Sequence, residues 1–156
     1  MPTIHICHPN NAPDDIPMLH IQAKPPGWLQ ATCPRSVPVL CPAGAEVEYL
    51  EMLLRKRWNG EVVPEQLLNA YRNAYTARIE AQAHIGALDP DWLRDDQGEV
   101  ITGDVALVCT CSNAEAEAGR CHRMWAGEIL AQTGKWSIVY GKAESTEKQT
   151  SLWSKP

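Results

Sequence analysis

The sequence predicts a single-domain α/β sandwich with a small, mainly parallel sheet and flanking helices. Its last third holds an apolar run at 105–109, a helical pattern at 121–133 and a second apolar run at 136–140, which is the order of a βαβ unit. Its 156 residues suffice for one full hydrophobic core and not for two. We expect this domain to span residues 1–142 and residues 143–156 to form a polar, mobile tail.

The first part of the chain is rich in proline. Because proline fixes the backbone angle φ and lacks an N–H donor, long helices are not expected in residues 1–45, which hold most of the chain's twelve prolines. The alternating segment 3–7 predicts a strand. A second strand is predicted at 37–41, where Pro38 places it at an edge or at a strand start. The segment 25–36 between them is expected to be an ordered loop.

Two amphipathic helices are predicted in the middle of the chain. Apolar residues recur at intervals of three and four residues over 47–58, and Asn59 with Gly60 supplies a stop signal. A second apolar stripe runs over 64–83 and starts with a proline, which suits the first position of a helix. The segment that follows is rich in turn residues, with a short helical turn expected at 90–93.

The last third supplies the remaining elements. The run 105–109 is apolar throughout, as a strand buried on both faces requires. Residues 110–120 are predicted to be a loop. The helix 121–133 ends before Gly134, the residue type favoured in a left-handed cap, and the strand 136–140 follows. A strand, a helix and a strand in this order imply parallel strands.

Charge and hydropathy exclude several classes of protein. The formal net charge is -5, and Lys and Arg are scattered except at 55–57, so a nucleic-acid surface built on bulk charge is not expected. No window of about eighteen apolar residues predicts a membrane span. The start lacks the basic and apolar regions of a secretory signal, so we expect a cytoplasmic protein with reduced cysteines. Glycine-rich phosphate loops are also absent from the sequence.

The segment DVALVCTCSNAEAEAGRCHRMWAGEIL, at 104–130, concentrates three of the six cysteines. In a βαβ unit, ligands bind at the carboxyl ends of the strands, beside the first turn of the next helix. The positive end of a helix dipole lowers the pKa of a thiol, so Cys121 at the helix N-cap predicts a solvent-open nucleophile. In this hypothesis His122 is the acid or base, and Arg123 orients or neutralises the substrate.

The ligand that this hypothesis implies is a small anion, such as a nucleotide derivative, bound at the amides of the helix start. Glu128 is placed to fix Arg123 or to contribute to the site. The wider binding set is Arg120, Cys109, Thr110, Cys111 and Glu128.

A base for the thiol is harder to place. Adjacent residues on a helix point apart, so Cys121 and His122 are not expected to pair directly. A base from another strand end remains open, and the candidates are His5, His8, Cys7 and Cys41.

A second hypothesis is a metal site. Soft thiolates and imidazole suit zinc, and three cysteines with one histidine form a known structural shell, here Cys109, Cys111, Cys121 and His122. The spacing of these residues differs from that of the usual zinc fingers. The protein is then a non-catalytic binding or accessory module whose metal stabilises a partner surface. In a third hypothesis Cys109 is a small core residue and the chain is an interaction protein with a plain core.

The block 103–130 resembles the closing signature of the YeaO-like family of uncharacterised proteins, in which a strand ending in Cys is followed by a loop, Cys-His-Arg and a helix. The stretch 67–80 resembles that family's Tyr-containing helix. This chain has a longer loop with an additional thiol and a different, proline-rich start. The resemblance implies a small α/β fold and no specific reaction. It places the family's characteristic residues on Cys109, Cys121, His122, Arg123 and Glu128.

Overall fold

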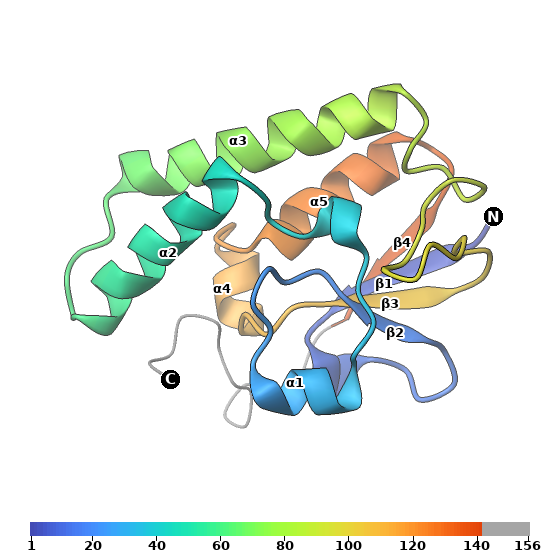
Figure 1. The fold of residues 1–156 in the computed structure, drawn as a ribbon, viewed down its shortest axis with the longest axis horizontal. Coiled ribbons are helices and arrows are strands. Elements are labelled where there is room, and N and C mark those ends of the chain that lie inside the picture. Colours follow the sequence, from blue (N-terminus) through green and yellow to red (C-terminus); the bar gives the residue numbers. More distant parts are fainter. Residues whose placement is uncertain (142–156) are drawn as a thin grey trace.

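A four-stranded parallel sheet lies at the centre of the computed structural model (Figure 1). The structure describes residues 1–141, so the expected tail at 143–156 lies outside the described residues. The strands lie in the order β2-β3-β1-β4. Their bounds are β1 Thr3–Cys7, β2 Met18–His20, β3 Val105–Val108 and β4 Ser137–Tyr140. The predicted α/β fold with a parallel sheet is confirmed. The two strands of the predicted βαβ unit, β3 and β4, lie on either side of β1.

Strand β3 is buried on both faces, as its apolar sequence predicts. Val105 and Leu107 belong to the larger of two hydrophobic clusters, and Ala106 and Val108 belong to the smaller one. Because successive side chains of a strand point to opposite faces, these two clusters lie on the two sides of the sheet.

The three long helices cover one face of the sheet, and a short helix covers the other (Figure 1). Helix α5 packs on β1 and β4, α3 packs on α5, and α2 packs on α3. Their bounds are α2 Ala45–Trp58, α3 Glu65–His84 and α5 His122–Gln132. The sequence predicts each to within two residues at its ends. The helix ends are well predicted because the sequence marks them with strong stop signals. Gly60 and Gly134 have φ angles of 72° and 70°, in the left-handed region that ends a helix.

The proline-rich part differs from the prediction. Residues Pro38–Leu40 form a single turn of 3-10 helix, η2, so the predicted strand at 37–41 is wrong. The N–H of Leu40 and the N–H of Cys41 donate to carbonyls three residues earlier. In a strand, these N–H groups would instead donate to a neighbouring strand. The predicted loop 25–36 contains helix α1, Gly27–Thr32. Strand β2 and the short 3-10 helix η1, Pro9–Asn11, were not predicted either.

The predicted loop 110–120 contains helix α4, Asn113–Glu117. Ser112 caps this helix by accepting a hydrogen bond from the N–H of Glu115 at 3.2 Å. Ser-x-x-Glu is a capping-box pattern, so the sequence does carry a signal for this helix start. At the turn expected over 90–93, the N–H groups of Trp92 and Leu93 both donate to the carbonyl of Asp89, at 2.9 Å, so the chain makes one hydrogen-bonded turn there without a regular helix.

Arg78 of α3 ties the proline-rich part to the helices. Its guanidinium donates to both carboxylate oxygens of the buried Glu46, at 2.7 and 2.9 Å. It also donates to the carbonyls of Val39 and Cys41, at 2.8 and 2.7 Å. The ion pair with Glu46 is the main cause of a raised pKa of Arg78. These bonds replace the sheet pairing that the η2 segment lacks.

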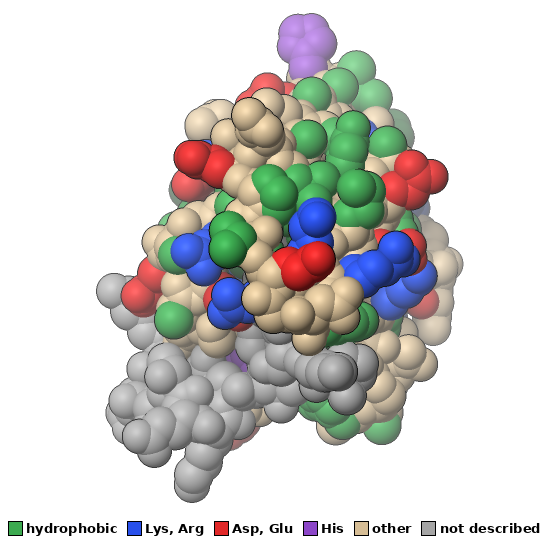
Figure 2. Space-filling model, turned by 90° about the vertical axis from the view of Figure 1, so that its left-hand side faces the viewer, with side chains coloured by type: hydrophobic (Ala, Val, Ile, Leu, Met, Phe, Trp, Pro, Cys, Tyr) green, Lys and Arg blue, Asp and Glu red, His purple; other side chains and the backbone are tan. Residues whose placement is uncertain are grey.

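Figure 2 shows how charged and hydrophobic side chains are distributed over one face of the molecule. On the face drawn in Figure 2, basic and acidic side chains are interspersed and hydrophobic side chains lie between them. The absence of a nucleic-acid surface stays a prediction. Within residues 1–141, no helix is both long enough and apolar enough to cross a membrane.

Two tyrosines of α3 give a matched test of this packing. The buried Tyr75 hydroxyl donates to the carbonyl of Leu40 at 2.7 Å, so Tyr75→Phe should lower the free energy of unfolding by about 1–2 kcal/mol. The buried Tyr71 hydroxyl has no hydrogen-bond partner among the described residues, so Tyr71→Phe should be neutral or stabilising. Urea unfolding of both variants measures the difference, and equal losses would contradict the assignment.

Candidate functional site

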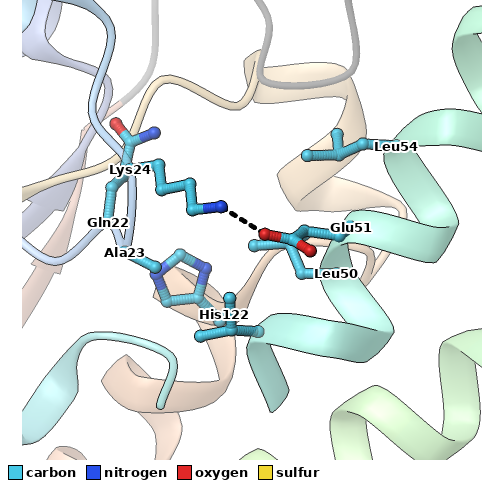
Figure 3. A pocket seen from close by; sticks show the side chains of 8 residues that line it. Gln22, Ala23, Lys24, Leu50, Glu51, Leu54 and His122 are labelled. Carbon is cyan, nitrogen blue, oxygen red and sulfur yellow. Dashed lines mark hydrogen bonds and ion pairs between the residues drawn. The ribbon is translucent and has the colours of Figure 1, made fainter. Parts of the chain in front are cut away.

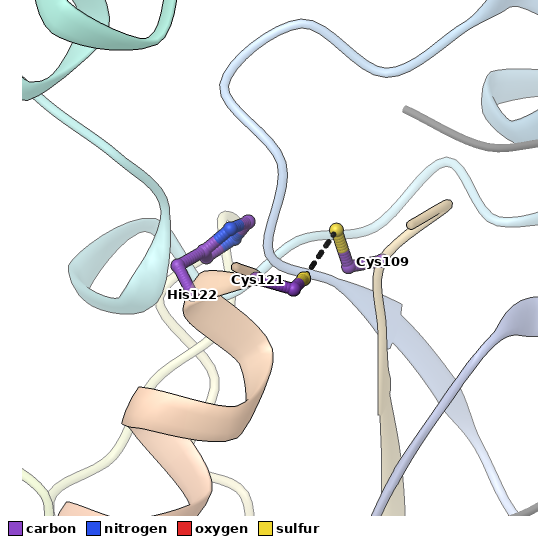
Figure 4. Close-up of side chains that lie close together, drawn as sticks. All are labelled: Cys109, Cys121 and His122. Atoms are coloured by element: carbon purple, nitrogen blue, oxygen red, sulfur yellow. Dashed lines mark hydrogen bonds between the residues drawn. The ribbon is translucent and has the colours of Figure 1, made fainter. Parts of the chain in front are cut away.

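Three cysteines and one histidine meet where β3 ends and α5 begins. Figure 4 shows three of these residues, Cys109, Cys121 and His122. The Sγ of Cys109 lies 3.5 Å from the Sγ of Cys121 and 3.7 Å from the Sγ of Cys111. One ring nitrogen of His122 and the sulfur atoms of Cys109 and Cys121 all lie within 4.8 Å of one another. We call these residues the Cys-His cluster: Cys109, Cys111, Cys121 and His122. Three of them can therefore hold a metal ion, and Cys111 is in contact with the set.

The start of α5 explains how neighbouring residues share one cluster. Cys121 is the N-cap, as predicted, and its backbone is extended, with φ -118° and ψ 132°. His122 is the first helical residue. The expectation that the two side chains point apart assumed helical geometry for both residues. Because Cys121 stands outside the helix, its sulfur and the His122 ring reach the same cluster.

The cluster is sealed from solvent, which corrects the expectation of a solvent-open nucleophile. Cys109 and Cys111 are 0% exposed, and Cys121 and His122 are 1% exposed. Helix α3 supplies the cover: the Tyr75 ring lies against the His122 ring, with centroids 5.4 Å apart. The position of Cys121 at the helix N-cap was predicted correctly, but helix α3 packs over it and closes the site.

Arg123 is buried beside the cluster and holds its backbone. Its Nη1 donates to the carbonyls of Cys109 and Cys111, at 2.9 and 2.6 Å. Its Nη2 donates to the Oδ1 of Asn113 at 2.9 Å. The side chain is 2% exposed, and no carboxylate pairs with it among the described residues. Arg123 thus places one positive charge behind the loop that carries the thiols.

The three thiols are unequal. Burial opposes ionisation of Cys109, but hydrogen bonds from the other two thiols, the charge of Arg123 and a backbone N–H outweigh it and hold its pKa well below the usual range. Burial and the neighbouring sulfur atoms raise the pKa of Cys111 well above its usual range. The donor bonds and Arg123 therefore favour the thiolate form of Cys109 over that of Cys111.

The end of β2 supplies two polar contacts that sequence reasoning missed. The Nε2 of His122 lies 2.6 Å from the carbonyl oxygen of Ile21. The N–H of Thr110, which is buried, donates to the Oε1 of Gln22 at 3.0 Å. No sequence motif connects these residues, because the pairing of β2 with β3 and the packing of α5 on the sheet bring them together.

Several predicted site residues are not part of the cluster. Arg120 is exposed and lines a surface hollow with residues of the α2–α3 connection. Glu128 is exposed on α5, and the partners of Arg123 are carbonyls and an amide, so Glu128 does not fix Arg123. These two residues lie on the surface, and their place in a binding site stays a prediction.

The proposed bases also lie elsewhere. His8 accepts a hydrogen bond from the N–H of Asn10 at 3.1 Å and caps η1. Cys7 packs in the smaller hydrophobic cluster, on the opposite face of the sheet, and Cys41 donates to the carbonyl of Val37 at 3.4 Å. Neither these residues nor His5 joins the metal-capable group in the described part of the chain.

No protein-family model, curated protein or solved structure matches the chain. The resemblance to the YeaO-like family rests on the Cys-His-Arg block and stays a prediction.

The burial of the thiols predicts slow thiol chemistry. Burial raises the pKa of Cys7 and Cys33 to about 11 and that of Cys41 to about 12, so these residues hold little thiolate near neutral pH. We expect the five buried cysteines of the native protein to react with an aromatic disulfide reagent only at its rate of unfolding, the partly exposed Cys41 to react sooner, and all six cysteines to react in denaturant. Rapid native labelling of Cys121, located by mass spectrometry, would reinstate the open nucleophile.

Proposed function

We propose that this protein is a non-catalytic binding or accessory module in which the Cys-His cluster holds a soft metal ion, best matched by zinc. The observation that carries the proposal is the convergence of two thiols, Cys109 and Cys121, and the His122 imidazole in a place sealed from solvent, with the Cys111 thiol in contact with Cys109. Soft thiolate and imidazole ligands favour zinc over magnesium or calcium, which prefer oxygen ligands.

The sulfur separations support a tetrahedral site. With zinc–sulfur bonds of about 2.3 Å, two sulfur ligands of a tetrahedron lie about 3.8 Å apart. The observed separations from Cys109, 3.5 Å to Cys121 and 3.7 Å to Cys111, are close to that value. Cys111, which contacts Cys109, is the candidate for the fourth ligand.

The surroundings supply what such a site needs outside its ligands. The contact of His122 Nε2 with the Ile21 carbonyl fixes the ring and leaves Nδ1 as the nitrogen available for a metal. Three thiolates and one divalent ion carry a net charge of -1 in total, and Arg123 offsets that charge from behind the loop. Buried groups thus hold the His122 ring and the backbone of Cys109 and Cys111 in place.

The closed geometry favours a structural role for the metal. A catalytic zinc keeps a position for water or substrate, whereas a structural zinc is enclosed by four protein ligands. The nucleophile hypothesis has weaker support, because a buried Cys121 cannot meet an anionic substrate without local unfolding. A metal here would lock the end of β3, helix α4 and the start of α5 as one surface.

Metal analysis of the purified protein tests the proposal. We expect about one zinc per chain by elemental analysis of protein purified without added metal, and loss of that zinc in Cys109→Ser. The matched control is Cys33→Ser, which changes another buried cysteine whose thiol donates to the carbonyl of Met18, at 3.3 Å. This control should keep the zinc.

Chelation tests the site without a substitution. A strong zinc chelator should lower the melting temperature of the wild-type protein, and added zinc should restore it. A wild-type protein free of metal, or a Cys109→Ser variant that retains it, would refute the proposal.

The pH dependence follows from the ligands. Thiolates must be deprotonated to bind a metal, so protons compete with zinc. We expect zinc to be retained near pH 8 and released progressively as the pH falls to about 5. A chromophoric zinc indicator measures the release, and retention that does not depend on pH would argue against thiolate ligands.

A further inference from the structure

A small cavity lies between the end of β2 and helix α2 (Figure 3). Its volume is about 40 Å³. Most of its wall is apolar, and its lining residues are Gln22, Ala23, Lys24, Val47, Leu50, Glu51, Leu54 and His122. His122 belongs both to this wall and to the Cys-His cluster, yet the cavity has its own polar group and does not depend on a metal.

That polar group is the amide of Gln22, which is 3% exposed. Its Oε1 accepts the hydrogen bond from the N–H of Thr110. Because a backbone N–H can only donate, this bond fixes which end of the amide is the oxygen. The Nε2 is therefore a fixed donor, and it has no hydrogen-bond partner among the described residues. In Figure 3 this nitrogen is turned toward the side of the cavity that α2 forms.

A buried donor without a partner costs free energy, so a site that keeps one favours a ligand with an acceptor. The apolar wall calls for carbon next to that acceptor. The size sets a further limit: one water needs about 10–15 Å³ by the same measure, so the cavity takes a group of about three or four heavy atoms.

The rim indicates an uncharged ligand. Lys24 and Glu51 form an ion pair across the mouth, which balances the local charge (Figure 3). Both side chains are exposed in part, 73% and 43%, and exposed ion pairs contribute little to stability. The rim can therefore open, so that the rest of a larger ligand extends from the cavity into solvent.

We propose that this cavity is a binding site for the carbonyl end of a small uncharged ligand, whose oxygen accepts a hydrogen bond from Gln22 Nε2. The carbon atoms next to the carbonyl pack on Leu50 and Leu54 of α2. The ligand thereby joins α2 to the end of β2, two parts of the chain that the Lys24–Glu51 pair also links.

Acetone is a suitable probe, because it combines one carbonyl oxygen with two methyl groups. We expect a saturable shift of the Gln22 side-chain amide resonances in a nitrogen–proton NMR titration of the full chain. Gln30 is the internal control, since its exposed side chain already donates to the carbonyl of Pro25 at 2.8 Å. Methylammonium, which is small and has donors only, should give no saturable shift at Gln22.

Two variants locate the site. Gln22→Met removes the donor and should weaken acetone binding at least tenfold, measured in this variant and in the wild type by the backbone amide resonance of Leu50, which also lines the cavity. Leu54→Phe fills the cavity, leaves the Gln22–Thr110 bond in place and should have the same effect, which keeps the test valid if the first variant folds poorly. A Gln22 resonance that moves only in parallel with Gln30, or equal binding in Leu54→Phe, would overturn the proposal.

Discussion

The candidate site depends on one buried guanidinium. Arg123 reaches from the first turn of α5 to two carbonyls after β3 and to Asn113 at the start of α4. A buried charge needs hydrogen bonds that replace its lost hydration. These three acceptors supply them to Nη1 and Nη2, whereas the buried Nε has no hydrogen-bond partner among the described residues. The consequence is that the loop carrying Cys109 and Cys111 is fixed against the residue before α5, where Cys121 stands.

The layering of the fold then decides what the cluster can do. In an open α/β sheet the carboxyl ends of the strands form a crevice, and a nucleophile there is accessible to solvent. Here α3 packs on α5 and its tyrosines cover the start of α5. Thiols in such a place are shielded from reagents and close to one another, which suits coordination of a metal better than attack on a substrate.

The proline-rich part contributes the remaining wall. Its strands β1 and β2 pair in the sheet, but the η2 segment does not, and side-chain bonds from α3 hold that segment in place. This attachment positions the residues after β2, where the Ile21 carbonyl meets His122 and Gln22 meets Thr110. The cluster and the small cavity beside it are therefore built from segments about a hundred residues apart in the chain.

The sequence by itself determined the parallel strands β1, β3 and β4, the three long helices and the place of Cys121 at a helix N-cap, because these follow from local periodicity and from caps. The sequence also contains a capping-box pattern at Ser112 that predicts the start of α4. The tertiary structure alone decided that β1 lies between β3 and β4, that Glu128 and Arg120 face away from the cluster, and that Cys121 is sealed. The reason is that burial is a property of contacts between distant segments, and a local pattern of residue types does not specify which helix will cover a given sulfur atom.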